Sequence, residues 1–583
     1  MSTLFKEVNY NLAALIQQID MGMIGLPDIQ RPFVWADTKV RDLFDSMYKG
    51  YPVGYFLFWA NANVEHTKGI GTDAKQKHPN LLIVDGQQRL TSLYAVIKGR
   101  EIIRENYDRA TIVIAFNPVE GKFEIPDASI RKNPRYFQNI SQIWQPNINI
   151  IKVINEFLQN LKKTVSISEE EEEQIQNAFM QLKHLESYPF SALELSTQIT
   201  EEQVADVFVR INSQGKTLNQ ADFILTLMSV FWEEGRKDLE EFCRLCRLPS
   251  KDAASPFNYL IDPDPDQMLR VSVGLSFRRA RLQYVYSILR GKDLETGDFS
   301  TERRDSQFEH LKTAQAKALN IQHWHEFIKA VKQAGFARQD YISSKNNLLY
   351  AYIFFLIGRE DFGMDLYDLK KLIGKWFFMS SITGRYTGSP ETIMEMDLAR
   401  LRGISTAAAF KTVLDDIIHS QLTNDFWEMT LPLNLSTSSS TSPSLYAYYA
   451  GLYVLGANGL FSRLKVSDLL QEGLRSKKSA LERHHLFPKA WLQQNGITEQ
   501  RDTNQIANYA LVEWSDNIDI SDTAPSEYLP AYLSRLTEEE KQRMYYWHAL
   551  PEHWEQMDYH AFLIERRKRI ALVVRDAFAE ICK

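Results

Sequence analysis

The sequence predicts a mixed α/β, mostly helical protein built from several domains. Its 583 residues, 44% apolar and 24% charged, are enough for about three to five domains with buried cores. Helical and strand-like apolar patterns alternate in the first part of the chain, whereas from about residue 150 the pattern is almost wholly helical. A short mixed segment follows the serine-rich stretch Ser436–Pro443. We therefore expect an α/β domain at 1–230, a helical middle region at 231–435 and a small mixed domain at 436–583.

Apolar spacing and capping residues predict the individual elements. Helices are expected over residues 10–19 and 39–49, and strands over 55–59, 81–84 and 111–115. Ser168, followed by the acidic run 169–173, predicts a capped helix start in which Glu171 completes a capping box. The apolar run Leu348–Ile357 fits a buried helix and is too short for a membrane span of about twenty residues. One long helix is expected from Tyr559 onward.

Composition and charge narrow the functional class. Three cysteines cannot form a disulfide framework, which favours a reducing compartment. The opening residues Met1–Lys6 lack the basic start and apolar run of a secretory signal. We therefore expect a cytoplasmic protein with no membrane partner. The formal charge of −7, taken alone, argues against nucleic acid as a partner, but it is an average over a long chain.

The net charge hides three local clusters of basic residues. They comprise Arg278, Arg279, Arg281 and Arg290 with Tyr284 and Tyr286 interleaved; Arg475, Lys477, Lys478, Arg483 and Lys489; and the run Arg566–Arg569. Basic runs are often only solvated faces. The second cluster, however, surrounds the adjacent pair His484 and His485, and three such clusters together suit a track for DNA phosphates.

Residues 81–93 predict an apolar strand, a polar turn and a helix. Gly86 permits a tight or positive-φ turn, and the helix that follows would direct its N-terminal amides and positive dipole end at the turn. Arg89 could donate two hydrogen bonds to an anion, and Asp85 could contact a metal or a hydroxyl group. This is what a phosphate-binding turn requires, although the chain has no Walker A motif. Strand–turn–helix joints with one glycine also occur without ligands, so these residues alone leave both interpretations open.

Two further segments accompany this turn. Pro27–Trp35 carries Gln30 and Arg31 in a loop stiffened by prolines, and Phe208–Thr217 places Arg210 and Asn212 before a glycine turn. In this order, the three motifs resemble the N-terminal domain of the GmrSD family of modification-dependent restriction enzymes, whose core is similar to the ParB/sulfiredoxin fold. The resemblance covers roughly residues 5–230 and implies binding and hydrolysis of a nucleoside triphosphate (ATP, GTP or UTP). It assigns Asp85, Gly86, Gln87, Gln88 and Arg89 to the nucleotide, with Gln30, Arg31, Arg210 and Asn212 nearby.

A second constellation lies near the C-terminus. His484, His485, Leu486 and Pro488 match the first-strand pattern of an HNH, or ββα-metal, nuclease. Asn508 and Asn517 stand at the spacing expected for the second strand and the helix.

Each residue type suits a step of that chemistry. A neutral imidazole at His485 can take a proton from the attacking water. His484 and Asn517 would hold one divalent metal, for which hard phosphate oxygens favour Mg²⁺ or Mn²⁺. Ni²⁺ and Zn²⁺ are also candidates, because imidazole is a good ligand for both ions. Other HNH enzymes often carry Asp at the position of His484, so the preferred metal here can differ from theirs. Asn508 is expected to join the ends of the hairpin loop by side-chain hydrogen bonds rather than to touch the substrate.

This segment resembles the C-terminal HNH domain of the same family, over roughly residues 440–583. Both resemblances on one chain imply a single-polypeptide type IV restriction enzyme of the bacterial cytoplasm, active in anti-phage defence. It would cleave double-stranded phage DNA carrying modified cytosines (5-methyl, 5-hydroxymethyl or glucosylated), dependent on or stimulated by a nucleoside triphosphate. A homodimer is expected, because cutting two strands with one-strand sites needs two sites or two sequential nicks.

Two alternatives remain open from the sequence. One is a sensor of backbone phosphorothioation that hydrolyses nucleotide and nicks DNA. The other is a nucleotide-switched DNA-binding regulator whose HNH fold no longer cuts; the intact set of His484, His485 and Asn517 argues against it.

Overall fold

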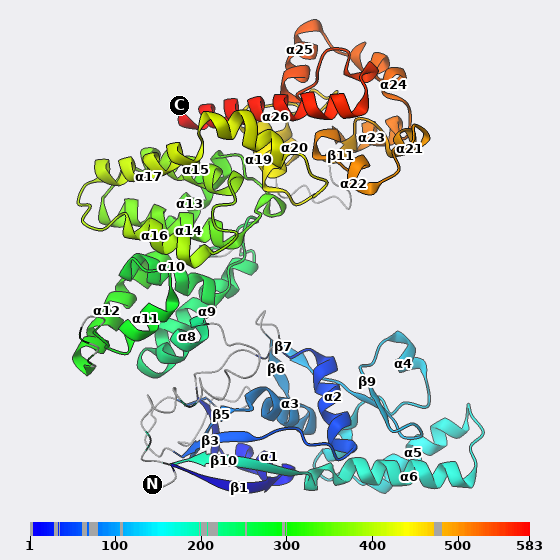
Figure 1. Ribbon diagram of the computed structural model, residues 1–583. Coiled ribbons are helices and arrows are strands. Elements are labelled where there is room, and N and C mark those ends of the chain that lie inside the picture. The colour runs from blue at the N-terminus through cyan, green and yellow to red at the C-terminus, as the bar shows by residue number, and fades with distance from the viewer. Residues whose placement is uncertain are drawn as a thin grey trace. The chain divides into compact units, whose positions relative to one another are not determined.

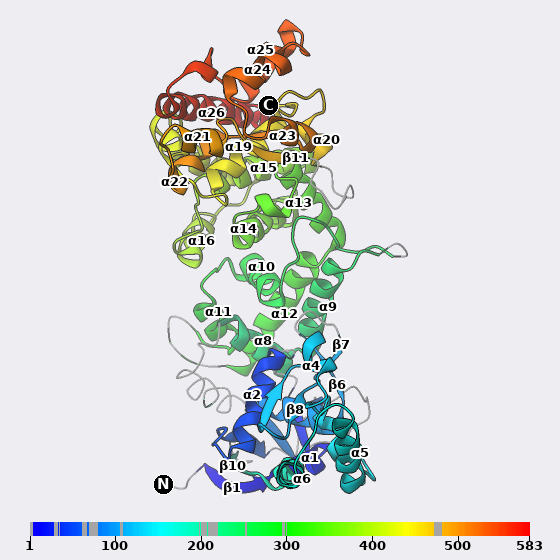
Figure 2. The ribbon, with the colours of Figure 1, turned by 90° about the vertical axis from the view of Figure 1, so that its right-hand side faces the viewer.

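The computed structural model divides into two compact units, residues 1–236 and 237–583 (Figures 1 and 2). The structure describes residues 4–27, 33, 35–60, 67–68, 80–104, 109–196, 199, 207, 220–250, 253–293, 296, 298, 300–470 and 481–583. Among these residues, none of the helices combines the length and the apolar character needed to cross a membrane.

A six-stranded mixed sheet forms the centre of the N-terminal unit. Its strands, in spatial order, are β1 (Phe5–Asn11), β10 (Pro189–Leu195), β3 (Phe56–Ala60), β5 (Leu81–Asp85), β2 (Ile24–Pro27) and β4 (Thr67–Lys68). The β10–β3 and β5–β2 pairs are parallel, and the other pairs are antiparallel. Two small hairpins are formed by β6 (Glu101–Ile103) with β7 (Arg109–Thr111) and by β8 (Ala115–Asn117) with β9 (Lys122–Glu124).

Five helices build a large apolar core with the sheet: α1 (Leu12–Asp20), α2 (Asp37–Tyr48), α3 (Gln87–Lys98), α5 (Ile150–Lys162) and α6 (Glu169–His184). Two further helices, α4 (Ala128–Lys132) and α8 (Gln220–Phe231), contribute no described residue to this core. Phe56 and Phe58 of β3 contribute to this core, whereas Leu57 and Trp59 belong to a smaller cluster, as the two-residue alternation of a strand requires. The helix α6 begins as predicted, because Ser168 and Glu171 complete a capping box.

Three sequence expectations in this unit need correction. The helix expected over 10–19 begins only at Leu12, because Tyr10 and Asn11 pair with β10 and Asn11 then caps the helix. The strand expected over 111–115 is interrupted: β7 ends at Thr111 and β8 begins at Ala115. The strand β10 was not anticipated within a region expected to be helical. Its residues form a strand because they pair with β1 on one side and β3 on the other, contacts distant in sequence.

The C-terminal unit is almost entirely helical. Its helices are α10 (Pro265–Phe277), α11 (Leu282–Leu289), α12 (Thr301–Ala318), α13 (Ile321–Gln333), α14 (Lys345–Leu356), α15 (Leu366–Ile382), α16 (Pro390–Ala399), α17 (Ala407–Gln421), α18 (Leu431–Asn434), α19 (Pro443–Val454), α20 (Val466–Leu469), α21 (Lys489–Gln494), α22 (Gln500–Thr503), α23 (Trp514–Ile520), α24 (Pro525–Leu533), α25 (Glu538–Trp547) and α26 (Tyr559–Cys582). A further helix, α9 (Glu233–Arg247), spans the division between the units.

In this unit, helices of the middle region pack against helices that follow residue 436. The helix α14 is buried from Asn347 to Leu356, as its apolar sequence predicts. The terminal helix α26 is also confirmed, and it packs against α19 and α15. The middle region and the residues after 436 therefore share one compact unit.

A two-stranded antiparallel hairpin, β11 (Leu481–His485) with β12 (Tyr509–Glu513), is set into this helical unit. The helix α23 follows β12 directly and contacts both strands. Together with the sheet of the N-terminal unit, these elements confirm the mixed α/β, mostly helical class.

Candidate functional site

The turn after β5 is shaped by the packing of Gly86. This residue has φ +95° and precedes α3 as its N-cap. A Cβ atom at this position would lie 2.5 Å from the ring of Phe56. Only glycine therefore fits both the backbone angle and the space, and the polar residues 85–89 are held at the start of α3.

Arg89 is tied to the protein's own backbone. Its Nη2 donates to the carbonyl oxygen of Tyr55 at 2.6 Å, and its Nη1 donates to the carbonyl oxygen of Val53. The guanidinium also lies 5.4 Å from the ring centre of Phe56. Burial lowers the pKa of Arg89, while the charge of Asp85 opposes this shift. Arg89 thus holds the segment 53–55 against the first turn of α3, a role that the sequence did not indicate.

The structure brings part of the predicted nucleotide site together. The Asp85 carboxylate lies 3.8 Å from the guanidinium of Arg89, and its side chain is one-third exposed. Gln87 and Gln88 occupy the first turn of α3, where both are half-buried. The other predicted members, Gln30, Arg31, Arg210 and Asn212, lie outside the described residues.

The hairpin of the C-terminal unit fixes two histidines on opposite faces of one strand. In β11, His484 is paired with Ala510 and His485 with Tyr509. Successive side chains of a strand point to opposite faces, so adjacent histidines must have different surroundings. One face carries His484 and Glu482 toward α23, and the other carries His485.

His484 and Asn517 form the predicted pair, joined by a third residue. The Nδ1 atom of His484 lies 3.0 Å from Oδ1 of Asn517, and Nδ2 of Asn517 donates to Oε2 of Glu482 at 2.7 Å. Because an amide oxygen only accepts, the proton of this imidazole is on Nδ1 and the lone pair is on Nε2. Burial lowers the pKa of His484 to about 4, which keeps the ring neutral at pH 7.

The Nε2 atom of His484 is buried and has no hydrogen-bond partner among the described residues. Buried polar atoms are nearly always paired, so such an atom needs an explanation. A metal-bound histidine uses one nitrogen as the ligand and donates its other N–H to an oxygen acceptor, which is the state of this ring. His484 can therefore offer its Nε2 lone pair to a divalent metal, while Asn517 and Glu482 form the hydrogen-bonded chain that orients its ring.

His485 has a different setting. Its Nε2 lies 3.0 Å from Oδ1 of Asn504, and its ring packs edge-on against Tyr509 with 4.8 Å between ring centres. The contact with Asn504 places the proton on Nε2 and leaves Nδ1 as the basic nitrogen. Burial, followed by the charges of Lys489 and Arg483, lowers the pKa of His485. His485 is only half-buried, so of the two adjacent histidines it is the one that solvent reaches.

Asn508 makes the loop-joining hydrogen bonds that its position predicts. Its Oδ1 accepts from the amide of Phe487 at 2.8 Å, and its Nδ2 donates to the carbonyl oxygens of Phe487 at 3.0 Å and Thr503 at 3.3 Å. The side chain is fully buried. Asn508 therefore closes the segment between β11 and β12 and does not face a substrate.

The basic residues near the hairpin divide into exposed and buried groups. Arg483 and Lys489 are exposed on either side of the histidine pair. Arg566, in contrast, is completely buried: it donates to the carbonyl oxygens of Ala507 at 2.6 Å and His548 at 3.1 Å. The prediction that the whole run Arg566–Arg569 faces phosphate is therefore wrong for its first member, which holds α26 to the hairpin loop.

Two residues of this site were missed in the sequence, Glu482 and Asn504. Glu482 stands two positions before His484, so the alternation of a strand could have placed both on one face. Asn504 is 19 residues from His485, and no spacing rule indicates that contact. In the described part of the chain, no group of three or more His, Cys, Asp or Glu side chains is arranged to hold a metal ion.

Comparisons with known proteins extend over both units. Residues 12–229 match the family model of the GmrSD restriction endonuclease N-terminal domain. The uncharacterized protein MJ0686 of Methanocaldococcus jannaschii is 23% identical over 547 residues, which cover 89% of this chain and 86% of that protein. The first match contains the turn at residues 85–89, and the second necessarily includes much of the C-terminal unit.

Proposed function

We propose that this protein is a metal-dependent DNA endonuclease of anti-phage defence, controlled by a nucleoside triphosphate. The observation that carries the proposal is the β11–β12–α23 unit, which pairs His484 with Asn517 and leaves one imidazole nitrogen unmatched. The match of residues 12–229 to a restriction endonuclease domain supports DNA as the substrate. The hairpin lies in the other unit, and it would supply the nuclease centre.

In this proposal His485 is the general base. Its Nε2–H is directed at Asn504, which leaves Nδ1 free to take a proton from the attacking water. A pKa lowered by burial keeps the ring neutral at pH 7, the state that a base requires. The exposed Arg483 and Lys489 supply positive charge for the DNA backbone.

His484 would hold the divalent metal through Nε2, and Asn517, which was expected to share the ion, would instead orient the ring by accepting from Nδ1–H, with Glu482 orienting the amide of Asn517. When bound, such an ion stabilises negative charge on the scissile phosphate and the leaving oxygen. Oxygen donors favour Mg²⁺ or Mn²⁺, and the imidazole makes Ni²⁺ or Zn²⁺ further candidates. His484 contributes a lone pair at Nε2, because its Nδ1 proton is engaged by Asn517.

The nucleotide would bind at the turn of the N-terminal unit. Gly86 brings the backbone to the start of α3, where the positive end of the helix dipole favours phosphate. Asp85, Gln87 and Gln88 are proposed to contact the nucleotide. Arg89 would act by fixing the segment 53–55, since two of its donors are used there.

Gln30, Arg31, Arg210 and Asn212 would complete the nucleotide site. The bound nucleotide would be ATP, GTP or UTP. Double-strand cleavage by one-strand centres is best served by a homodimer. The proposed substrate is double-stranded phage DNA with 5-methyl-, 5-hydroxymethyl- or glucosylated cytosine.

Digestion of matched DNAs tests the function. Unmodified, 5-methyl-, 5-hydroxymethyl-, glucosylated and phosphorothioate duplexes are incubated with Mg²⁺ or Mn²⁺, with and without each nucleoside triphosphate. We expect metal-dependent cuts in one or more modified-cytosine duplexes, faster with nucleotide. Cleavage confined to phosphorothioate DNA would overturn the substrate, and absence of cleavage on every duplex would overturn the nuclease assignment.

Calorimetry tests the nucleotide turn separately. Asp85→Ala is expected to weaken triphosphate binding at least tenfold. Glu156→Ala, an exposed acidic residue on α5 of the same unit, is the matched control and should bind as wild type does. Equal affinities for the two variants would contradict the assignment of Asp85.

A further inference from the structure

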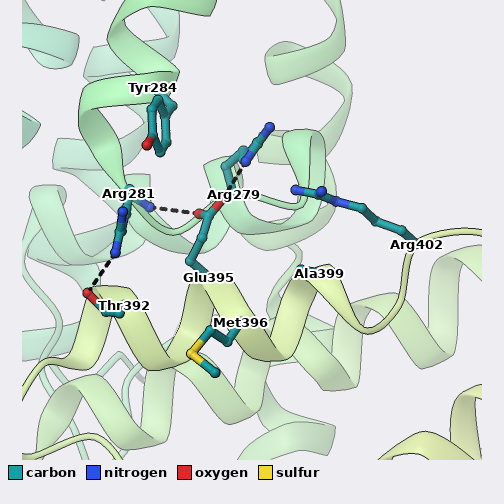
Figure 3. A pocket seen from close by; sticks show the side chains of 8 residues that line it. All are labelled: Arg279, Arg281, Tyr284, Thr392, Glu395, Met396, Ala399 and Arg402. Atoms are coloured by element: carbon teal, nitrogen blue, oxygen red, sulfur yellow. Dashed lines mark hydrogen bonds and ion pairs between the residues drawn. The ribbon is translucent and has the colours of Figure 1, made fainter.

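The C-terminal unit contains an open pocket of about 480 Å³ where the α10–α11 turn meets α16 (Figure 3). Its lining includes Arg279, Arg281, Tyr284, Thr392, Glu395 and Arg402. In both ribbon views this region lies away from β11, with other helices of the unit between them (Figures 1 and 2). The pocket is therefore distinct from the candidate nuclease centre.

Glu395 organises one wall of this arginine pocket. One carboxylate oxygen accepts from the Arg279 side chain at 2.6 Å. The other accepts from the backbone amides of Ala280 at 2.7 Å and Arg281 at 3.1 Å. These bonds fix the turn between α10 and α11 on the helix α16. Glu395 therefore neutralises Arg279, and no carboxylate of the described residues pairs with the side chains of Arg281 and Arg402.

The other two arginines of the pocket, Arg281 and Arg402, differ from nearby arginines in that no described acid pairs with their side chains. The Arg281 side chain donates to the hydroxyl of Thr392 at 3.2 Å, and the side chain of Arg402 makes no hydrogen bond or ion pair with any described residue. Other arginines nearby are each paired with an acid: Arg270 with Glu391, Arg278 with Asp361 and Arg385 with Asp397. Three arginines against one glutamate give the pocket lining a net charge of +2.

An aromatic ring stands beside these cations. Tyr284 is 39% exposed, and the guanidinium of Arg279 lies 5.5 Å from the centre of its ring. Figure 3 shows the Tyr284 ring on the same side of the pocket as Arg279 and Arg281, with Arg402 extending toward them. Guanidinium and hydroxyl donors suit phosphate oxygens, and an exposed ring suits stacking with a base.

We infer that this pocket binds one nucleotide of a DNA strand. Arg281, Arg402 and the hydroxyl of Thr392 contact the phosphate, and the base stacks on Tyr284. The inference rests on the proposed function, in that it takes DNA as the substrate. It adds a contact remote from the cleavage centre, which retains a strand while the hairpin acts.

Binding is measured by fluorescence anisotropy with the full chain in EDTA, so that DNA is not cut. Labelled single-stranded and duplex oligonucleotides are titrated over a series of salt concentrations. The double variant Arg281→Ala/Arg402→Ala is expected to bind single-stranded DNA at least tenfold more weakly. Its plot of log affinity against log salt should be shallower by about one unit, because a phosphate contact is lost.

A second variant separates stacking from charge. Tyr284→Leu should weaken single-strand binding about tenfold and leave the salt slope unchanged, since a base–ring contact releases no counterions. Arg400→Ala is the matched control: this exposed arginine is two residues from Arg402 but does not line the pocket. It should bind as the wild type does.

Equal DNA affinities for Arg400→Ala and the double variant would overturn the inference. It would also be overturned if the double variant lost affinity only for free nucleoside triphosphate, which would identify a small-molecule site instead. Failure of the nuclease proposal gives a different result: His485→Ala would then cut DNA as well as wild type, whereas the anisotropy results do not depend on cleavage.

Discussion

The turn at residues 85–89 and the hairpin at 481–520 use polar residues in opposite ways. In the turn, the conspicuous cation Arg89 donates to the backbone carbonyls of Val53 and Tyr55. In the hairpin, the conspicuous imidazole of His484 is paired on one nitrogen and left unmatched on the other. A polar residue of a motif can therefore stabilise the fold or take part in the reaction. It stabilises the fold when all its polar atoms are hydrogen-bonded within the protein, and it is available for the reaction when one of them is not.

Residues within each motif also have different roles. In the hairpin, the side chain of Asn508 bonds to the backbone, while His484 and His485 each keep one ring nitrogen that no described residue binds. In the turn, Gly86 and Arg89 stabilise the backbone, while the side chain of Asp85 stays partly exposed. Three experiments, in order of decreasing expected effect, test this difference between the two motifs.

The largest effect is expected from Asn508→Ala. Removal of its amide leaves the backbone groups of Phe487 and Thr503 buried without partners, at a cost of about 3 kcal/mol or more. Hydrogen exchange of the β11 and β12 amides should then accelerate roughly a hundredfold. Asn495→Ala, in an exposed position of the same segment, is the control and should change exchange little. Similar exchange in both variants would mean that Asn508 does not close the hairpin.

The second effect tests Arg89 as a structural residue. A Cβ atom at Gly54 would lie 2.1 Å from Nη1 of Arg89, whereas one at Gly50 meets nothing within 4 Å. Both glycines have positive φ, so the two alanine variants share the backbone strain and only Gly54→Ala adds the clash. Because the guanidinium must move and give up its hydrogen bonds to Val53 and Tyr55, we expect Gly54→Ala to be less stable than Gly50→Ala by about 2 kcal/mol in denaturant unfolding of the N-terminal unit.

A double-variant cycle isolates the contact in that experiment. In an Arg89→Ala background the clash is removed, and the stability difference between the two glycine variants should shrink to near zero. An unchanged difference would show that Arg89 does not occupy the space beside Gly54.

The smallest effect concerns pH and the buried histidines of the C-terminal unit. Burial lowers the pKa of His548 to about 3, below the unfolded value of about 6.5. Between these values the unfolded chain binds the extra proton, so the free energy of unfolding falls as pH drops below about 6.5. At pH 5.5 the loss is about 1.4 kcal/mol for this group.

Hydrogen exchange of α26 at pH 7 and pH 5.5, corrected for intrinsic amide exchange, measures this loss. His548→Gln removes this titrating group and should reduce the pH dependence by its share, while His484 and His485, whose pKa values are also lowered by burial, still contribute. The helix α3 of the N-terminal unit serves as an internal reference. A variant with the full wild-type slope would contradict the assignment to His548.

Local patterns predicted much of both sites, and contacts distant in sequence account for what they missed. The glycine turn at Gly86, the histidine strand and the loop-joining role of Asn508 follow from short motifs. The acceptors of Arg89, the contact of His485 with Asn504 and the burial of Arg566 each depend on segments brought together only by folding. The strand β10 was missed for the same reason, because its partners β1 and β3 are far away in the chain.

Single-turnover cleavage of supercoiled plasmid bearing modified cytosines tests whether the hairpin is a metal-dependent nuclease centre. His485→Ala is compared with His560→Ala, an exposed histidine on α26, at saturating Mn²⁺ and in EDTA. If His485 is the general base, the first variant loses about 10²- to 10⁴-fold in rate while the second cuts as the wild type does, and EDTA abolishes cutting by all three. Equal rates for the two variants, or cutting that persists in EDTA, would contradict a metal-dependent nuclease centre at the hairpin.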